Sequence, residues 1–180
     1  NSLYEVSIGS ENGSLEANTN GSGMFSYLDN VDTLDLTGLD TSNMTSMSMM
    51  FYKSTSLKSI DVSGFDTSKV VNMNGMFWEC SNLTSINISN FNTSKVTDMN
   101  NMFAECSNLI TLDLSNFDTS NVIYMGNLYS YSYGGMFRNC SSLKELNVSS
   151  FNTSKVKYMS NMFQGCSSLT TLDLSNFNTS

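Results

Sequence analysis

A 26-residue unit repeats along this chain, and its fixed period limits the possible folds more than any other feature. The clearest copy, LTSINISNFNTSKVTDMNNMFAECSN, runs from Leu83 to Asn108. A period of about 20 to 50 residues is typical of an elongated stack in which each copy packs against the next. We therefore predict a solenoid without a single central core.

The repeats predict a simple domain organisation. We expect an N-terminal cap and loop over residues 1–30 and then, over 31–180, five full repeats and one truncated repeat. An insertion at 127–134 interrupts the fourth repeat. Because the pattern begins and ends within a repeat, we also expect other domains in a longer parent chain. The repeats start at residues 31, 57, 83, 109, 143 and 169.

The composition excludes several classes of partner. Sixteen acidic and eight basic residues give a net charge of -8. A nucleic-acid binder instead needs clustered Lys and Arg, and no apolar run reaches the roughly 20 residues that span a bilayer. We expect no nucleic acid and no direct membrane insertion.

Catalytic and metal chemistry are also not expected. The chain has no His, and no unique pair of carboxylates or nucleophile beside a base can be identified. No Cys-x-x-Cys pair suggests a zinc site. We expect no enzyme activity, no cofactor, and neither catalytic nor metal-binding residues.

Two periodicities occur within each copy. Ile86 to Ser89 alternate between apolar and polar, which indicates a short strand with one buried face. Residues 92–106 place apolar side chains three and four positions apart, which indicates a short amphipathic helix. The Asp/Asn-Thr-Ser tripeptide at the start of this segment indicates a helix cap and turn. The predicted fold class is an α/β solenoid, a right-handed leucine-rich-repeat-like stack with one strand and one helix per 26-residue coil.

The Phe and Cys residues, and every Met except Met49, recur at fixed repeat positions, which predicts that they are sealed between coils. The cysteines share one position, and we favour reduced, buried thiols, although disulfides between coils remain an alternative. The predicted structural core contains Met76, Phe77, Cys80, Met102, Phe103, Cys106, Met136, Phe137, Cys140, Met162, Phe163 and Cys166.

The strand pattern L-x-x-L-x-L, together with N-T-S-K-V-x-x-M-x-x-M-F-x-x-C-S, resembles the 26-residue BspA-type leucine-rich repeat of bacterial surface proteins. The resemblance covers roughly residues 31–180. It implies a curved, right-handed solenoid outside a bacterial cell, usually tethered to the envelope and often acting in adhesion.

Two surfaces are candidates for ligand binding. Outward strand positions form a polar ladder, which either binds a ligand or only keeps an exposed sheet soluble. The insertion alternates Tyr and Ser, a composition typical of binding loops, although a tolerated surface insertion is the alternative. The candidates are Asp61, Asn87, Asp113 and Asn147 in the ladder, and Tyr124, Tyr129, Tyr131, Tyr133 and Tyr158 in or beside the insertion.

Two functions fit these features. The first is a cell-surface adhesion module, extracellular on a bacterium, that recognises a host or cell-surface protein or glycan. The second is a structural spacer that projects another domain and has no ligand of its own. The insertion favours the first, because a pure spacer has no need to break its period.

Overall fold

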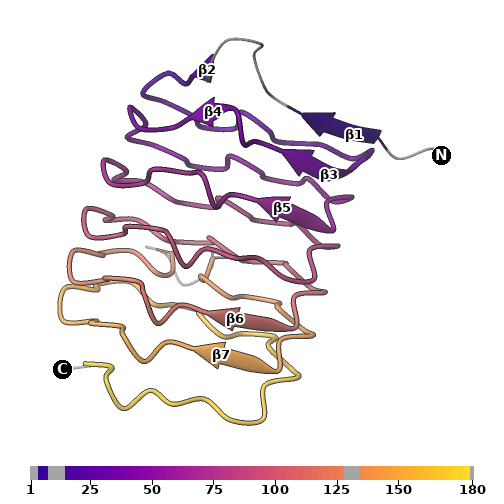
Figure 1. The fold of residues 1–180 in the computed structure, drawn as a ribbon. Helices are drawn as coiled ribbons and strands as arrows, with labels where there is room; N and C mark the ends of the chain where they lie inside the picture. Colours follow the sequence, from indigo (N-terminus) through magenta and orange to yellow (C-terminus); the bar gives the residue numbers. More distant parts are fainter. Residues whose placement is uncertain (1–3, 8–14, 128–133, 179–180) are drawn as a thin grey trace.

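The computed structural model describes residues 4–7, 15–127 and 134–178. Consecutive copies of the repeat lie one above another as layers, which we call coils (Figure 1). All strand pairs are parallel. The strands are β1 (Tyr4–Ser7), β2 (Leu15–Glu16), β3 (Val31–Asp35), β4 (Leu39–Asp40), β5 (Ser59–Asp61), β6 (Thr111–Asp113) and β7 (Glu145–Asn147).

One side of the stack, here called the strand wall, carries β1, β3, β5, β6 and β7 (Figure 1). The strands form where the sequence alternates, as in β5, whose central Ile60 is buried between exposed neighbours. β1, β3 and β5 form one sheet, and β6 and β7 form another. The copies that start at 83 and 169 have no strand in their described residues, so the expected strand over 86–89 is absent.

The opposite side, here called the turn wall, corrects the predicted fold class. The described residues contain no helix, so the prediction of an α/β solenoid with one helix per coil was wrong. Tight turns occupy the segments that we expected to be helical. The turn wall consists of residues 45–54, 71–80, 97–106, 123–125 with 136–140, and 157–166.

Backbone geometry explains why these segments do not form helices. In the coil that contains Met73 to Cys80, Gly75 and Glu79 have φ values of 59° and 61°. A right-handed helix needs a negative φ throughout, whereas a positive φ at the third residue is what a type II turn requires. The N–H groups of Met76 and Cys80 accordingly donate to carbonyls three residues earlier.

The turns free other backbone groups to bond between coils. The N–H groups of Met73, Gly75 and Phe77 donate to carbonyl oxygens of the next coil at 2.8–2.9 Å. In a helix these groups would bond within the same coil. The chain therefore gives up internal helical bonds and gains a ladder of bonds to its neighbour.

The absence of helices also changes the expected shape. Packed helices lie about 8–10 Å apart, but neighbouring strands lie only about 4.8 Å apart. In the turn wall, the rings of Phe51 and Phe77 stack with centroids 5.4 Å apart, and those of Phe77 and Phe103 stack at 5.6 Å. Both walls thus have a narrow spacing, and the predicted leucine-rich-repeat-like pairing of a wide helical side with a narrow strand side is not present.

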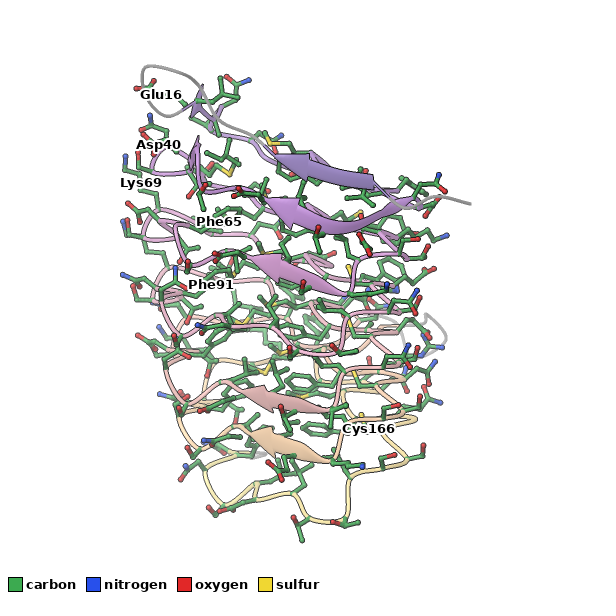
Figure 2. The ribbon with its side chains drawn as sticks, turned by 45° about the vertical axis from the view of Figure 1, so that its right-hand side comes forward. Glu16, Asp40, Phe65, Lys69, Phe91 and Cys166 are labelled. Atoms are coloured by element: carbon green, nitrogen blue, oxygen red, sulfur yellow. The ribbon has the colours of Figure 1, made fainter. Side chains whose placement is uncertain are left out.

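The interior is filled by the recurring apolar side chains. The Phe column continues through the coils, with Phe103 and Phe137 stacked at 6.0 Å. Met76, Met102 and Met136 are fully buried, and Phe163 is partly buried against the core. Phe65 and Phe91 lie inside the stack in consecutive coils, whereas charged side chains such as Lys69 lie along its edge (Figure 2).

A buried threonine joins the coils at the corner between the two walls. Thr67 donates its hydroxyl to the carbonyl of Asn92 at 3.0 Å and accepts the N–H of the same residue at 2.8 Å. No helix begins here, so the predicted helix cap was wrong. The preceding Asp66 instead forms a local turn by accepting the N–H of Ser68. The equivalent Thr41, Thr93, Thr119 and Thr153 are also buried and bond to the next coil.

Candidate functional site

The predicted polar ladder lies on the strand wall with its side chains exposed. Asp61 and Asp113 each accept the backbone N–H of the serine two residues later, at 2.9 and 3.0 Å. Asn87 and Asn147 make the same contact with Ser89 and Ser149. Each side chain therefore has a local structural role, because it closes a turn where the strand wall ends.

The structure brings only part of this ladder into one groove. A groove of about 700 Å³ runs over β6 and β7 and includes Asp113 and Asn147. Asp173 of the following coil also lines it, whereas Asp61 and Asn87 do not.

The local hydrogen bonds stabilise the charged form of the carboxyl groups on this face. Hydrogen bonds from Ser63 lower the pKa of Asp61, and those from Ser115 lower the pKa of Asp113. A carboxylate that accepts such bonds is stabilised in its charged form. These two carboxylates consequently keep their negative charge to a lower pH than an unpartnered Asp would.

The second candidate surface lies on the turn wall. The rings of Tyr124 and Tyr158 stack in parallel, with centroids 5.1 Å apart and an interplanar angle of 4°. Tyr124 is 37% exposed. The other predicted tyrosines, Tyr129, Tyr131 and Tyr133, lie outside the described residues.

The stack keeps its register across the insertion. Tyr124 pairs with Tyr158 in the same parallel series of bridges that joins Asn72 to Asp98. The two ends of the insertion meet in an antiparallel bridge between Gly126 and Gly135. The bridges between coils therefore keep the same register before and after the insertion, and Asn127 at its start bonds to Asn100 and Ser160 of the neighbouring coils.

The family of the chain follows from this repeat. A family model described as "Mycoplasma protein of unknown function, DUF285" matches residues 19–134 and 131–180. The chain belongs to this family. The two matches overlap at the end of the insertion, and no curated protein and no solved structure matches. DUF285 is a bacterial repeat family, so the match shows that the chain is a bacterial repeat protein. The match does not show that its repeats are of the BspA type.

The cysteines of this DUF285 protein share one buried environment. The thiol of Cys106 donates to the carbonyl oxygen of Phe77 at 3.1 Å, and Cys80, Cys140 and Cys166 make the equivalent contact. Ser54 makes it in an earlier coil, with 2.7 Å to the carbonyl of Phe25. All four cysteines are free, and burial raises the pKa of Cys80 to about 12. Such thiols are poorly reactive, since the thiolate is the nucleophile.

Two kinds of feature would bear on function in the part of the DUF285 chain that the structure describes: clusters of metal-ligating residues and membrane-spanning helices. Residues 4–7, 15–127 and 134–178 contain no group of three His, Cys, Asp or Glu residues that could hold a metal ion. No helix within these ranges could cross a bilayer.

Sequence reasoning gave no role to a third feature of this DUF285 protein, the edge where the turn wall ends. The repeat position of Trp78 is occupied in the other coils by Tyr52, Ala104, Arg138 and Gln164. The structure places Trp78 and Arg138 around one groove of about 500 Å³. The sequence did contain a signal for this groove, because the residue at the Trp78 position changes from coil to coil. A position that varies in this way is not needed for stacking.

Proposed function

We propose that this DUF285 chain is a ligand-binding repeat module of the bacterial cell surface that recognises an extracellular protein or glycan. Its resemblance to BspA-type leucine-rich repeats supports the surface location and the adhesive role. We place the main contact at the turn-wall face around Tyr124 and Tyr158.

The observation that carries this proposal is the way the two ends of the insertion meet. Its ends are held together by the Gly126–Gly135 bridge, and the N–H of Met136 donates to the carbonyl of Met125 at 2.9 Å. The bridges between coils continue on both sides of the insertion, so the register of the stack is kept. A tyrosine-rich segment that interrupts the period without changing the register of the stack is better explained by recognition than by support.

The neighbouring aromatic pair extends this surface. The position of Tyr124 and Tyr158 is polar in the preceding coils, where Ser46, Asn72 and Asp98 occupy it. Two stacked rings therefore replace small polar groups only in the coil that carries the insertion and in the coil after it. Tyrosine supplies large contact area and a hydroxyl at little cost in side-chain entropy, and is enriched at recognition surfaces.

A shortened chain tests the proposal. Deleting residues 128–133 would join Asn127 directly to Gly134 between the bridged Gly126 and Gly135. Asn-Gly is a favoured two-residue hairpin loop, so the stack should fold with an unchanged melting temperature. Binding would be measured against an array of extracellular matrix glycoproteins and glycans. We expect the full chain to bind at least one of them and the deletion to abolish that binding.

A substitution provides a matched variant that retains the full insertion. Tyr124→Ser and Tyr158→Ser introduce the residue that Ser46 already places at this position. We expect the double variant to fold normally and to weaken binding. Undiminished binding by both the deletion and the double variant would contradict the proposed contact surface.

A structural spacer remains the second candidate function. It is favoured by the strand wall, where side chains such as Asp61 and Asp113 close turns and so have a role without a ligand. A spacer predicts that the full chain binds nothing on the array.

A further inference from the structure

A groove of about 500 Å³ crosses four coils at the edge where the turn wall ends. This volume lies within the range of about 300–1,000 Å³ that small-molecule sites occupy. The groove combines one large aromatic ring, two carboxylates, one guanidinium and a row of hydroxyl groups. Its lining residues are Thr55, Trp78, Glu79, Ser81, Glu105, Ser107 and Arg138.

One repeat position changes in size between the coils that the groove crosses. Trp78 and Arg138 are the large residues at this position, and Ala104 stands between them. Ala104 is fully buried and does not itself line the groove, which at this position is bounded by Trp78 and Arg138.

Trp78 packs against the neighbouring coil and against the turn wall. Its ring lies 4.9 Å from that of Tyr52, which in turn packs edge-on against Tyr27 at 5.4 Å. A Cβ atom at Gly75 would lie 3.5 Å from Cε3 of the indole, so the ring also rests against the turn wall. Trp78 remains half-buried, and its position is fixed before any ligand arrives.

The charges around the groove are balanced. Glu105 receives hydrogen bonds from Arg138 and, at 2.9 Å, from Asn139. Glu79 lies 3.7 Å from the ammonium group of Lys53. Glu105 and Glu79 are therefore each paired with a basic residue. A charged ligand of either sign would have to compete with one of these ion pairs. This balance favours an uncharged ligand.

We propose that this groove binds a neutral oligosaccharide, with one pyranose ring against Trp78 and its hydroxyl groups bonded to Glu79, Glu105 and the serine and threonine hydroxyls. The C–H face of a pyranose is apolar and suits the negative face of an indole. Carboxylate oxygens accept hydrogen bonds from sugar hydroxyls. Because the groove extends over four coils, it fits a chain of sugars better than a single one.

This site does not depend on the proposed function at the insertion. Tyr124 and Tyr158 do not line the groove, and none of its lining residues belongs to the insertion. The loss of one binding activity should leave the other unchanged.

The single tryptophan gives a direct readout, because Trp78 is the only one in the chain. The intact chain would be titrated with cellohexaose, maltohexaose and chitohexaose while indole fluorescence is followed. Choline and sialyllactose would serve as cationic and anionic probes. We expect a saturable change with at least one neutral oligosaccharide, independent of salt concentration. No saturable change with any neutral probe, or a salt-dependent response to choline or sialyllactose alone, would overturn the proposal.

Variants then locate the binding, measured by calorimetry because Trp78 is removed in one of them. Trp78→Ala should weaken binding by about tenfold or more, as expected for loss of an aromatic platform. Gln164→Ala changes the same repeat position outside the groove and should have no effect. Where Trp78→Ala unfolds the chain, Glu79→Gln tests the same groove, because it keeps the size of the side chain. It should weaken the binding of the neutral oligosaccharide only modestly. Equal binding by Trp78→Ala and the unaltered chain would contradict the assignment.

Discussion

The strand wall and the turn wall arise from the same 26-residue period but use different backbones. On the strand wall, Leu34 and Ile60 are paired in extended parallel strands. On the turn wall, each coil has residues with positive φ, such as Asn101 at 58° and Glu105 at 62°. Both walls nevertheless bond to their neighbours in parallel register.

The difference shows which residues carry structural information in a repeat. Buried side chains three and four positions apart, such as Met99, Met102 and Phe103, suit a helix and also suit a series of tight turns. The residues between them give only part of the signal, because Met49 has a positive φ of 53° at the repeat position where Gly75 and Asn101 stand. Gly75 and Asn101 share one repeat position, and Gly and Asn are the residues that most readily adopt positive φ.

The largest effect is expected where the strand wall passes into the turn wall. Thr67→Val preserves the shape of a buried side chain but removes the hydroxyl that bonds both backbone groups of Asn92. We expect a loss of about 1–3 kcal/mol in the free energy of unfolding, the usual penalty for leaving a buried partner unsatisfied. Urea denaturation would measure it.

The same substitution on the strand wall is the matched control. Thr111 lies exposed in β6, so Thr111→Val should change stability by no more than about 0.5 kcal/mol. Equal losses at Thr67 and Thr111 would mean that the corner hydroxyls do not hold the coils together.

A smaller effect is expected from a glycine in the turn wall. Gly75 has a φ of 59°, and an added Cβ would lie 3.3 Å from Cγ of Met49. Gly75→Ala should therefore destabilise the chain by about 1–2 kcal/mol, the approximate penalty for a left-handed residue with a Cβ. The change in melting temperature would report it.

Gly64, in the turn that follows β5, provides the control for this prediction. It has no positive φ, and nothing lies within 4 Å of an added Cβ. Gly64→Ala should be neutral or should stabilise by about 0.4–1 kcal/mol through the unfolded chain. A larger loss at Gly64 than at Gly75 would contradict the contrast between the walls.

Much of the strand wall could be predicted from sequence. The alternation in Ser59 to Asp61 and in Thr111 to Asp113 identifies strands with one buried face. The turn wall could not be predicted from its apolar spacing, because apolar side chains three and four positions apart suit both a helix and a series of tight turns. Gly75 and Asn101 favour turns over a helix. Met49, Glu79 and Glu105 also have a positive φ but carry no such signal.

The candidate sites were predictable to different extents. The insertion broke the period and so was visible in the sequence, whereas the groove beside Trp78 requires residues from four coils. The hydrogen bonds of the Cys column were also missed. Ser54 in the equivalent position was the available signal, because serine and cysteine share a donor as well as a small size.

The smallest effects concern carboxylates, which respond oppositely on the two walls. On the strand wall, hydrogen bonds from Ser63 lower the pKa of Asp61 below its ordinary value of 3.8. On the turn wall, desolvation raises the pKa of Asp98. The charge of Asp61 therefore stabilises the fold above pH 3.8, and this contribution is lost as pH falls through its lowered pKa. The charge of Asp98 destabilises the fold, and this penalty develops as pH rises from 3.8 through its raised pKa.

Two substitutions test these opposite signs with residues that the repeat already uses, since Asn87 and Asn72 occupy the equivalent positions. Asp98→Asn should slightly raise the melting temperature at pH 7, and the gain should disappear below pH 3.8 because Asp98 is then protonated in both states. Asp61→Asn should slightly lower the melting temperature at pH 7, and the loss should vanish in more acidic solution. Melting curves recorded from pH 2 to pH 7 would compare the two. Shifts of the same sign at pH 7 would show that the surroundings of the carboxylates do not differ between the walls in the way their hydrogen bonds and burial indicate.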